Sequence, residues 1–333
     1  MALTATRRTV LAGGATLLAG RAVAQQATTL RLYSPALDTS AAMLAFEVPQ
    51  RTGGRYQVER IIGFDMLEAA LGRERAAGGD RVLLEGARSG ELDLVVCNAF
   101  PIGEYVPEAN AFYVPFLFRD DAHAQAVLDG PIGREMLGEL LGYGLVGLAW
   151  TQSGWRHVAN SKRPIRSPED LRGIKLRTAQ NPVEIEAFRT LGAEVVPMPI
   201  GKPVLDALAQ GAVDGVVIDI GAIINWEMFR WTRYLSLTGH IDAPAIIVMS
   251  KAAYDKLSEA DREAFAEAAR LAAQAERKHA DGDEVNGVAN LLGVGMKINA
   301  DVDKAAFRAA LAPAYAKWHE QFGDLIDRIQ SYQ

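Results

Sequence analysis

The sequence is poor in the residues that build covalent or metal-based sites. It contains a single cysteine, Cys97, which excludes an intrachain disulfide and a cluster of thiolate metal ligands. Its five histidines are scattered and form no metal-binding spacing such as H-E-x-x-H. Long basic runs are also missing and the formal net charge is −6, which argues against nucleic acid as a partner. These absences predict a protein that carries no metal or other cofactor.

The standard catalytic motifs are missing as well. The sequence has no G-x-S-x-G elbow, no G-x-x-x-x-G-K-[ST] loop and no G-x-G-x-x-G after a strand. Cys97 closes a hydrophobic run, which is typical of a buried side chain. A general base would have to be His240 or Asp219. We therefore predict that the chain is not an enzyme, and keep an enzyme that uses one of these two groups as an alternative.

Long hydrophobic runs are scarce, and the most conspicuous lies at the N-terminus. Arg7 and Arg8 precede a short apolar stretch over 10–19, and Ala22-Val23-Ala24 has the small-x-small pattern that signal peptidase cuts. Residues 1–24 are thus predicted to be a twin-arginine-type signal peptide, and the mature chain to be periplasmic. The alternatives are an uncleaved anchor and a leader in which the arginine pair occurs by chance. Cleavage would leave 32 of the 35 lysines and arginines against 41 acidic residues, a formal net charge of −9.

The rest of the chain alternates strand-like and helix-like runs, which is typical of an α/β fold. Strands are predicted over 28–33, 56–62, 92–97, 144–150, 174–177, 194–197, 213–218 and 245–249. Helices are predicted over 38–51, 82–88, 121–141 (two), from 167, 181–191, 204–210, 258–292 and 303–332 (one or two).

The length of 333 residues suggests about two domains. Lobe I is predicted over 25–150, with a return strand at about 243–252, and lobe II over 151–242. The remaining segment, 253–333, is predicted to hold a long strut helix that crosses both lobes, followed by packing helices. Mixed sheets flanked by helices would then enclose a ligand cleft between the lobes.

Two arginines are candidates for binding an anion in that cleft. Arg177 ends a predicted strand, and Arg156 follows the predicted crossing between the lobes. The planar guanidinium can hold a carboxylate through two parallel hydrogen bonds. The alternative for each is a surface ion pair with an acid such as Glu169 or Asp170.

The sequence resembles the solute-binding proteins of tripartite ATP-independent periplasmic (TRAP) transporters, of the dicarboxylate-binding (DctP) type. The resemblance covers about residues 28–325. It is carried by six motifs in family order: SGELDLVV (89–96), VPEANAFYVPFLFRDDAHAQAVLDG (106–130), GWRHVANSKRPIRSPEDLRGIKLR (154–177), LGAEVVPMP (191–199), GAVDG (211–215) and RYLSLTGH (233–240).

The resemblance implies a protein that captures a small organic acid, closes around it and delivers it to the subunits of a sodium-driven TRAP membrane permease. It would contact the membrane only through that permease. Arg177 matches the family arginine that pairs with the ligand carboxylate, and Arg156 matches the second frequent arginine. The alternatives are a periplasmic receptor that presents its ligand to a sensor kinase and a periplasmic enzyme that acts on an organic acid.

Three positions affect whether this chain is expected to bind the same ligand as other members of the family. Many members have an asparagine four residues after the GxVDG aspartate, where this chain has Ile218, which cannot donate a hydrogen bond. The adjacent Asp219 either faces the ligand or caps the next helix. Asp80 and Arg81 match the family's acid–arginine pair, although this chain has a few extra residues before them. Asp80 is therefore a candidate ligand contact from the first lobe.

Further side chains are candidates for the pocket wall. Asn98 and Phe100 follow the predicted strand over 92–97, Trp150 lies at the crossing, and Gln180 follows Arg177. Each is as well explained by packing as by ligand contact.

Overall fold

A computed structural model describes residues 26–34, 39–72 and 78–333 of the chain. The predicted signal peptide over 1–24 lies outside the described residues, as does most of the insertion before Asp80, residues 73–77.

The described residues form one nine-stranded mixed sheet with the order β2-β1-β3-β8-β4-β7-β5-β6, and β9 pairs with β8. β1 is parallel to β2 and β3, and β5 is parallel to β6 and β7. These two parallel groups form two halves of the sheet. The strands are β1 (Thr28–Ser34), β2 (Tyr56–Ile62), β3 (Leu94–Asn98), β4 (Leu145–Asn160), β5 (Lys175–Thr178), β6 (Glu194–Pro197), β7 (Gly215–Asp219), β8 (Tyr234–Ser250) and β9 (Lys297–Asn299).

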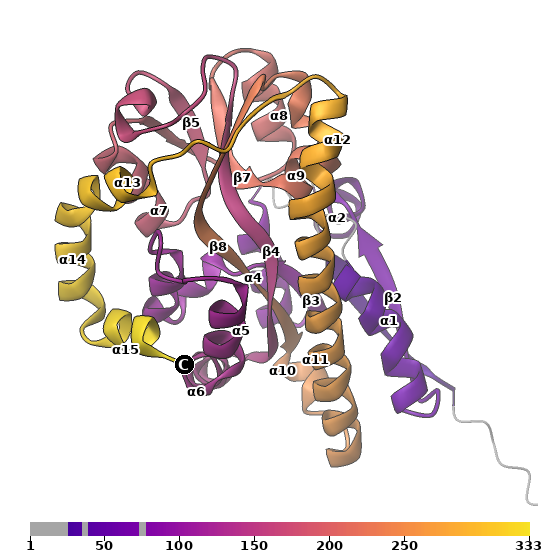
Figure 1. Cartoon of the computed structure of the whole chain (residues 1–333). Helices are drawn as coiled ribbons and strands as arrows, with labels where there is room; N and C mark the ends of the chain where they lie inside the picture. The colour runs from indigo at the N-terminus through magenta and orange to yellow at the C-terminus, as the bar shows by residue number, and fades with distance from the viewer. Residues whose placement is uncertain (1–25, 35–38, 73–77) are drawn as a thin grey trace, which may run out of the picture.

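The two halves are joined by β4 and β8, which run antiparallel to each other through the whole molecule (Figure 1). The strand predicted over 144–150 therefore does not end at Trp150 but continues to Asn160. The return strand likewise begins at Tyr234, before the predicted 243. Pairing irregularities around Gln152 and Trp155 let these long strands twist from one half into the other.

Helices cover both faces of the sheet, and η marks 3-10 or π turns. They are α1 (Thr39–Arg51), α2 (Phe64–Leu71), α4 (Asp80–Ser89), η1 (Phe100–Glu104), η2 (Pro107–Tyr113), α5 (Asp121–Asp129), α6 (Pro131–Glu139), η3 (Leu140–Tyr143), η4 (Pro168–Leu171), α7 (Pro182–Thr190), α8 (Lys202–Ala209), α9 (Ile220–Asn225), η5 (Met228–Arg230), α10 (Lys251–Tyr254), α11 (Glu259–Gly282), the π turn η6 (Asp283–Gly287), α12 (Val288–Gly293), α13 (Lys304–Ala310), α14 (Ala312–Phe322) and α15 (Leu325–Ser331).

The predicted long strut is present as α11, η6 and α12 in continuous succession (Figure 1). The Ser258 side chain accepts a hydrogen bond from the Asp261 amide at its start, as the cap pattern predicts. α11 packs against α1 and β4, whereas η6 packs against α9, so the strut contacts both halves.

Two helical predictions differ from the structure. The C-terminal segment forms three helices, because Pro313 starts α14 directly after α13 and Gly323, with φ 58°, separates α14 from α15. The helix predicted from residue 167 is only the single turn η4, whose Ser167–Asp170 capping box is present. Gly173, at φ 70°, then turns the chain into β5.

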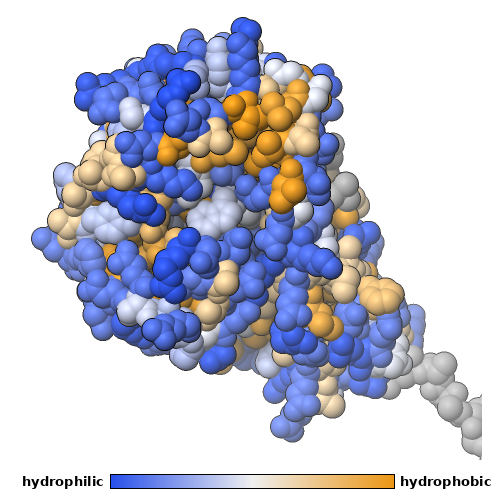
Figure 2. Space-filling view, in the orientation of Figure 1, coloured by the Kyte–Doolittle hydropathy of each residue, from blue (hydrophilic) through white to orange (hydrophobic). Residues whose placement is uncertain are grey.

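The face in Figure 2 is mostly hydrophilic, with an apolar area around α12. Exposed side chains from that part of the chain are Val285, Leu292 and Val294. No helix within the described ranges combines the length and apolar character that crossing a membrane requires.

Candidate functional site

A cavity of about 120 Å³ lies between the two halves of the sheet. A cavity needs roughly 10–15 Å³ to hold a single water molecule, so this one has room for a ligand of several heavy atoms. Both halves and the strut contribute walls. The lining residues are Ser34, Asp80, Cys97, Asn98, Phe100, Ser153, Arg156, Arg177, Ala179, Ile200, Ile218, Asp219, Gly221, Ala222, Asn225, Trp226, Ala245, Glu276, His279 and Asp283.

Neighbouring strands bring the charged side chains of the second half together. Arg156 on β4 pairs in register with Asp219, the last residue of β7. Arg177 lies one strand further on, opposite Val216 of β7. The cavity thus sits at the carboxyl ends of β5 and β7, where open α/β sheets bind ligands.

Arg177 is buried, with 3% of its surface exposed, and takes part in no ion pair within the described residues. Its Nε and Nη2 atoms donate to the Met198 carbonyl oxygen at 3.0 and 2.7 Å, which fixes the guanidinium plane. Burial lowers the pKa of Arg177 to about 10, with Glu184 acting in the opposite direction. A buried cation without an acidic partner favours an anion in the cavity beside it.

Arg156 is held differently, by a buried ion pair. Its Nη1 donates to the carboxylate of Glu184, which is fully buried, and its guanidinium lies over the Tyr113 ring at 5.5 Å. Glu184 also accepts from the Ala179 amide at 3.0 Å. The alternative of surface pairing with Glu169 or Asp170 is therefore wrong. Arg156 lines the cavity, and Glu184 offsets its charge.

Asp80 lies opposite these arginines, on α4 of the first half. It is 1% exposed; its Oδ1 accepts from the Asn98 amide at 3.3 Å, and its Oδ2 has no hydrogen-bond partner among the described residues. Burial raises the pKa of Asp80 to about 6, although the Asn98 amide and the Arg177 charge lower it. A buried carboxylate oxygen with no donor is costly, so this wall of the cavity favours a hydrogen-bond donor.

The pKa of Asp80 predicts a pH-dependent stability for the ligand-free protein. Because the pKa rises on folding from 3.8 to about 6, ionised Asp80 destabilises the fold. This effect is absent below pH 3.8, grows as the pH rises to about 6, and is complete above it. At about 1.4 kcal/mol per pKa unit, Asp80→Asn should raise the free energy of unfolding by about 2–3 kcal/mol at pH 7.5 and by little at pH 4. Urea unfolding at both pH values measures this, and equal effects at the two would contradict it.

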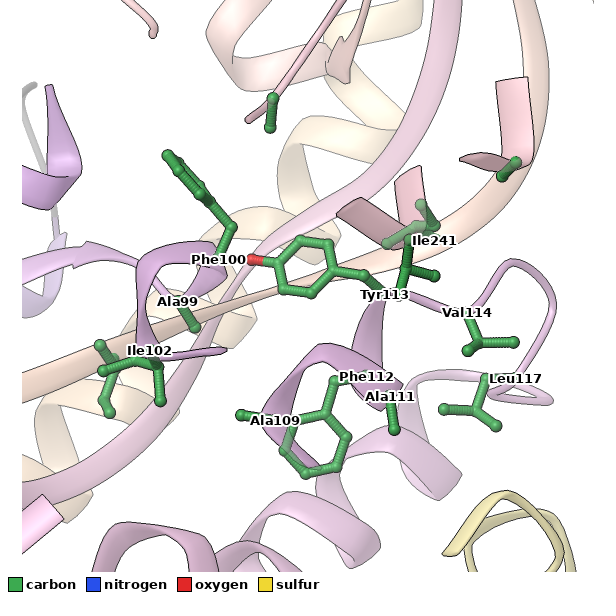
Figure 3. Close-up of a cluster of buried hydrophobic side chains, with 14 of the residues drawn as sticks. Ala99, Phe100, Ile102, Ala109, Ala111, Phe112, Tyr113, Val114, Leu117 and Ile241 are labelled. Atoms are coloured by element: carbon green, nitrogen blue, oxygen red, sulfur yellow. The ribbon is translucent and has the colours of Figure 1, made fainter. Parts of the chain in front are cut away.

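The other candidates in the cavity wall come from both halves. Asn98 ends β3, and Phe100 begins η1. Asp219 does both things that the sequence left open: it lines the cavity and caps α9 by accepting from the Ala222 amide at 2.7 Å. Ile218 also lines the cavity and adds an apolar surface to it. Figure 3 shows Phe100 projecting from η1, and Phe112 and Tyr113 from η2, within a cluster of buried hydrophobic side chains.

Three residues singled out from the sequence lie outside the cavity lining. Trp150 is 1% exposed; its Nε1 donates to the Gly133 carbonyl at 2.8 Å and its ring packs against Phe112. Gln180 is exposed. His240 is buried beside Phe188, with its Nδ1 2.7 Å from Thr238 Oγ1, and lines a separate small cavity. The structure therefore favours packing for Trp150, and it places the candidate base His240 away from the main cavity.

Two features of the site were not predicted from the sequence: the pairing of Glu184 with Arg156, and the cavity wall that α11 provides. Glu184 stands in the first turn of α7, where an acid is ordinary, so nothing in the sequence marked it as a partner of Arg156. Glu276, His279 and Asp283 do carry a signal, because their spacing of three and four places them on one helix face.

Comparison with known proteins places this architecture in a family. The model of the bacterial extracellular solute-binding proteins of family 7 (DctP) matches residues 37–321. A solute-binding protein of Verminephrobacter eiseniae is 44% identical over 299 residues, covering 90% of this chain and 84% of its relative.

Solved structures are similar over the same length. A TRAP periplasmic solute-binding protein from Polaromonas sp. JS666, bound to D-erythronate, has 39% identity and a TM-score of 0.84, over 92% of this chain and 99% of that chain. One from Bordetella bronchispeptica, with density assigned as pantoate, has 37% identity and the same TM-score and coverage. The predicted two-lobed α/β fold is thereby confirmed, and the chain belongs to family 7 of the bacterial extracellular solute-binding proteins, the DctP family.

Proposed function

We propose that this protein captures a small organic acid by pairing its carboxylate with Arg177. The observation that carries the proposal is the buried Arg177 guanidinium, which has no acidic partner within the described residues and lines the cavity between the two halves. Arg156 lines the same cavity and is proposed as a second contact. The relative bound to D-erythronate and the relative with density assigned as pantoate support the same ligand class, because both compounds are carboxylates.

Capture would be completed by closure of the two lobes. The cavity walls come from α4, β3 and η1 on one side, and from β5, β7 and α9 on the other. A ligand that touches both sides stabilises the closed arrangement through contacts that the open one lacks. The first lobe is proposed to be residues 25–150 with the return strand at about 243–252, and the second lobe residues 151–242, with the strut following both.

The loaded protein would then deliver its acid to the membrane subunits of a TRAP permease driven by a sodium gradient. Membership of the DctP family and the likeness to TRAP solute-binding proteins support this partner. The paired Arg7 and Arg8 before a short apolar stretch support export to the periplasm by the twin-arginine route.

A thermal-shift screen of the purified protein against a library of organic acids tests this function. The library contains D-erythronate and pantoate, and erythritol, which is erythronate with the carboxylate replaced by CH2OH, is the matched control. A bound acid at 100 times its dissociation constant adds about 2.7 kcal/mol of stability, which raises the melting temperature by several degrees. We expect such a shift with at least one acid and none with erythritol.

Mass spectrometry of the acid after incubation separates binding from turnover. Recovery of the unaltered acid agrees with a binding protein, whereas its conversion would support an enzyme. A library in which no carboxylate shifts the melting temperature would contradict the proposed function.

A further inference from the structure

Asp242 is buried in β8 at the place where the chain passes between the two halves of the sheet. It stands in register with Trp155 of β4, next to the irregularity in strand pairing between Gln152 and Trp155. Only 1% of the residue is exposed, and it is not among the described residues that line the main cavity. Capture of an acid by Arg177 therefore leaves a buried carboxyl group at this crossing unexplained.

The carboxyl group of Asp242 has one hydrogen-bond donor among the described residues. Gln152 Nε2 donates to its Oδ2, whereas Oδ1 is buried without a partner. Gln152 Oε1, which belongs to the same amide group, is a second buried acceptor without a partner in the described chain. A buried acceptor without a donor is costly, and a proton on Asp242 would convert one of its oxygens into a donor. The bonding here therefore favours the protonated carboxyl group.

The charges that face Asp242 do not compensate for its burial. α11 contributes Arg277 and Asp281, and α5 contributes Asp121. The guanidinium of Arg277 already forms a bidentate ion pair with Asp129, with Nη–O distances of 2.6 and 2.8 Å. Asp242 is thus faced by one cation that another acid neutralises and by two further acids, a setting in which a negative charge is disfavoured.

The pKa of Asp242 agrees with this geometry. Burial raises the pKa to about 7, the hydrogen bond from Gln152 and the charge of Arg277 lower it, and the two facing acids raise it further. η2 also packs against β8, but the hydroxyl group of its Tyr113 donates to the Pro244 carbonyl, at 3.2 Å. The carboxyl group is therefore set to titrate near neutral pH.

The groups around Asp242 belong to parts of the molecule that move against one another when the proposed lobes close. The Trp155 indole, from the second lobe, donates to Asp121 of α5 in the first lobe at 2.6 Å. A small cavity of about 10 Å³ is lined by both residues, by Gln152 and by residues of the strut, including Arg277. Because both lobes and the strut meet here, their rotation changes how closely Asp242 is enclosed.

We propose that Asp242 is a proton-binding site that links closure of the lobes to pH. In the arrangement described here the carboxyl group is enclosed and holds a proton, and in a more open arrangement water reaches it and the proton leaves. This inference rests on the proposed function, to which it adds a regulation. Capture of the acid then takes up a proton at Asp242, so a fall in pH strengthens capture and a rise in pH promotes release.

The pH range of the effect follows from the two protonation states. The pKa of Asp242 is about 7 in this arrangement and falls toward its ordinary value of 3.8 where water reaches the carboxyl group. Above about pH 7.5 Asp242 is ionised in both arrangements, so through this group the affinity for the acid should not depend on pH. Below about pH 7 the affinity should rise as the pH falls, by at most about tenfold for each pH unit.

Isothermal titration with D-erythronate between pH 5.5 and pH 8.5 tests the link. We expect the affinity at pH 5.5 to be at least tenfold higher than at pH 7.5, with less than a twofold change from pH 7.5 to pH 8.5. Titrations at pH 6.5 in phosphate and in Bis-Tris, which differ in ionisation enthalpy, should show about half a proton or more taken up per bound acid. If D-erythronate does not bind, the acid with the largest thermal shift takes its place.

The variant Asp242→Asn assigns the effect, because the amide keeps the size of the side chain and an acceptor for Gln152 but cannot titrate. The ratio of the affinities at pH 5.5 and pH 7.5 should be at least fivefold smaller in this variant than in the wild type. Asp261→Asn is the matched control: Asp261 is also buried and belongs to α11, but it pairs with Arg55, which precedes β2. It should keep the wild-type ratio.

A second variant, Gln152→Leu, tests the same carboxyl group if Asp242→Asn does not fold. It removes the donor that favours the ionised form, so the pKa of Asp242 should rise and the pH dependence of capture should move to higher pH. A dependence that stays in place or moves to lower pH would count against the proposal.

The outcomes separate this inference from the function beneath it. If acids bind with the same affinity at pH 5.5 and pH 7.5, or Asp242→Asn keeps the wild-type ratio, the link to pH fails while the proposed function stands. If no acid binds at any pH, the proposed function fails, and melting of the ligand-free protein decides the proton site. Asp242→Asn should then melt at a higher temperature than the wild type at pH 8 and at nearly the same temperature at pH 4. An equal difference at the two pH values would overturn the proton site.

Discussion

Replacing Arg177 by methionine is expected to weaken the binding of a carboxylate ligand at least a hundredfold. The substitution removes a buried charge and the donors that would face the ligand, and loss of one partner from such a pair costs about 2–5 kcal/mol. A hundredfold loss corresponds to about 2.7 kcal/mol. Titration of the variant with the acid found in the thermal screen measures the change.

The ligand-free form of this variant should be nearly as stable as the wild type. The wild type loses stability by burying the Arg177 charge, as its lowered pKa of about 10 reflects, and gains two hydrogen bonds to Met198. These effects oppose each other, so we expect a difference of about 1 kcal/mol or less. Arg163→Met is the control, because Arg163 also donates to two backbone carbonyls but is exposed. Unchanged affinity in Arg177→Met would remove Arg177 from the site.

Replacing Arg156 by methionine should instead destabilise the fold itself. The change leaves the fully buried carboxylate of Glu184 without its cationic partner, and breaking a buried ion pair in this way costs about 3–5 kcal/mol. The melting temperature should fall by roughly 10 °C, measured without ligand. The matched comparison is Arg270→Met, because Arg270 pairs with Glu267 on the exposed surface of α11, where such pairs contribute at most about 1 kcal/mol.

A double variant separates the ion pair from simple packing. Arg156→Met together with Glu184→Gln removes both charges, so it should be more stable than Arg156→Met alone. A double variant whose loss equals the sum of the two single losses would show that the pair contributes no coupling.

Much of the fold could be predicted from the sequence, because helix caps and strand ends are encoded by residues that are neighbours in the chain. Ser258 and Asn181 cap helices where the pattern predicts, and the strand over 175–178 ends where Arg177 reaches the cavity. The length of β4, in contrast, could not be predicted from neighbouring residues. Its residues around Trp150 are hydrophobic enough for a strand end or a strand interior, and only pairing with β8 decides between them.

The partners of the charged side chains in the site could not be predicted from the sequence. The sequence singled out Arg156 and Arg177 alike, yet one is paired with Glu184 and the other has no ion pair in the described chain. That difference arises because Glu184, in the first turn of α7, reaches Arg156 on β4, a contact that the sequence neighbours of the two arginines do not encode. The spacing of Glu276, His279 and Asp283 on one helix face can be read from the sequence. That this face lines the cavity is known only from the path of α11 in the structure.

A crystal structure of the protein with its acid tests the central claim most directly. The account predicts the ligand carboxylate within hydrogen-bond distance of the Arg177 guanidinium, between walls from both halves of the sheet. A carboxylate bound elsewhere in the cavity, with Arg177 still bonded only to the Met198 carbonyl, would contradict it.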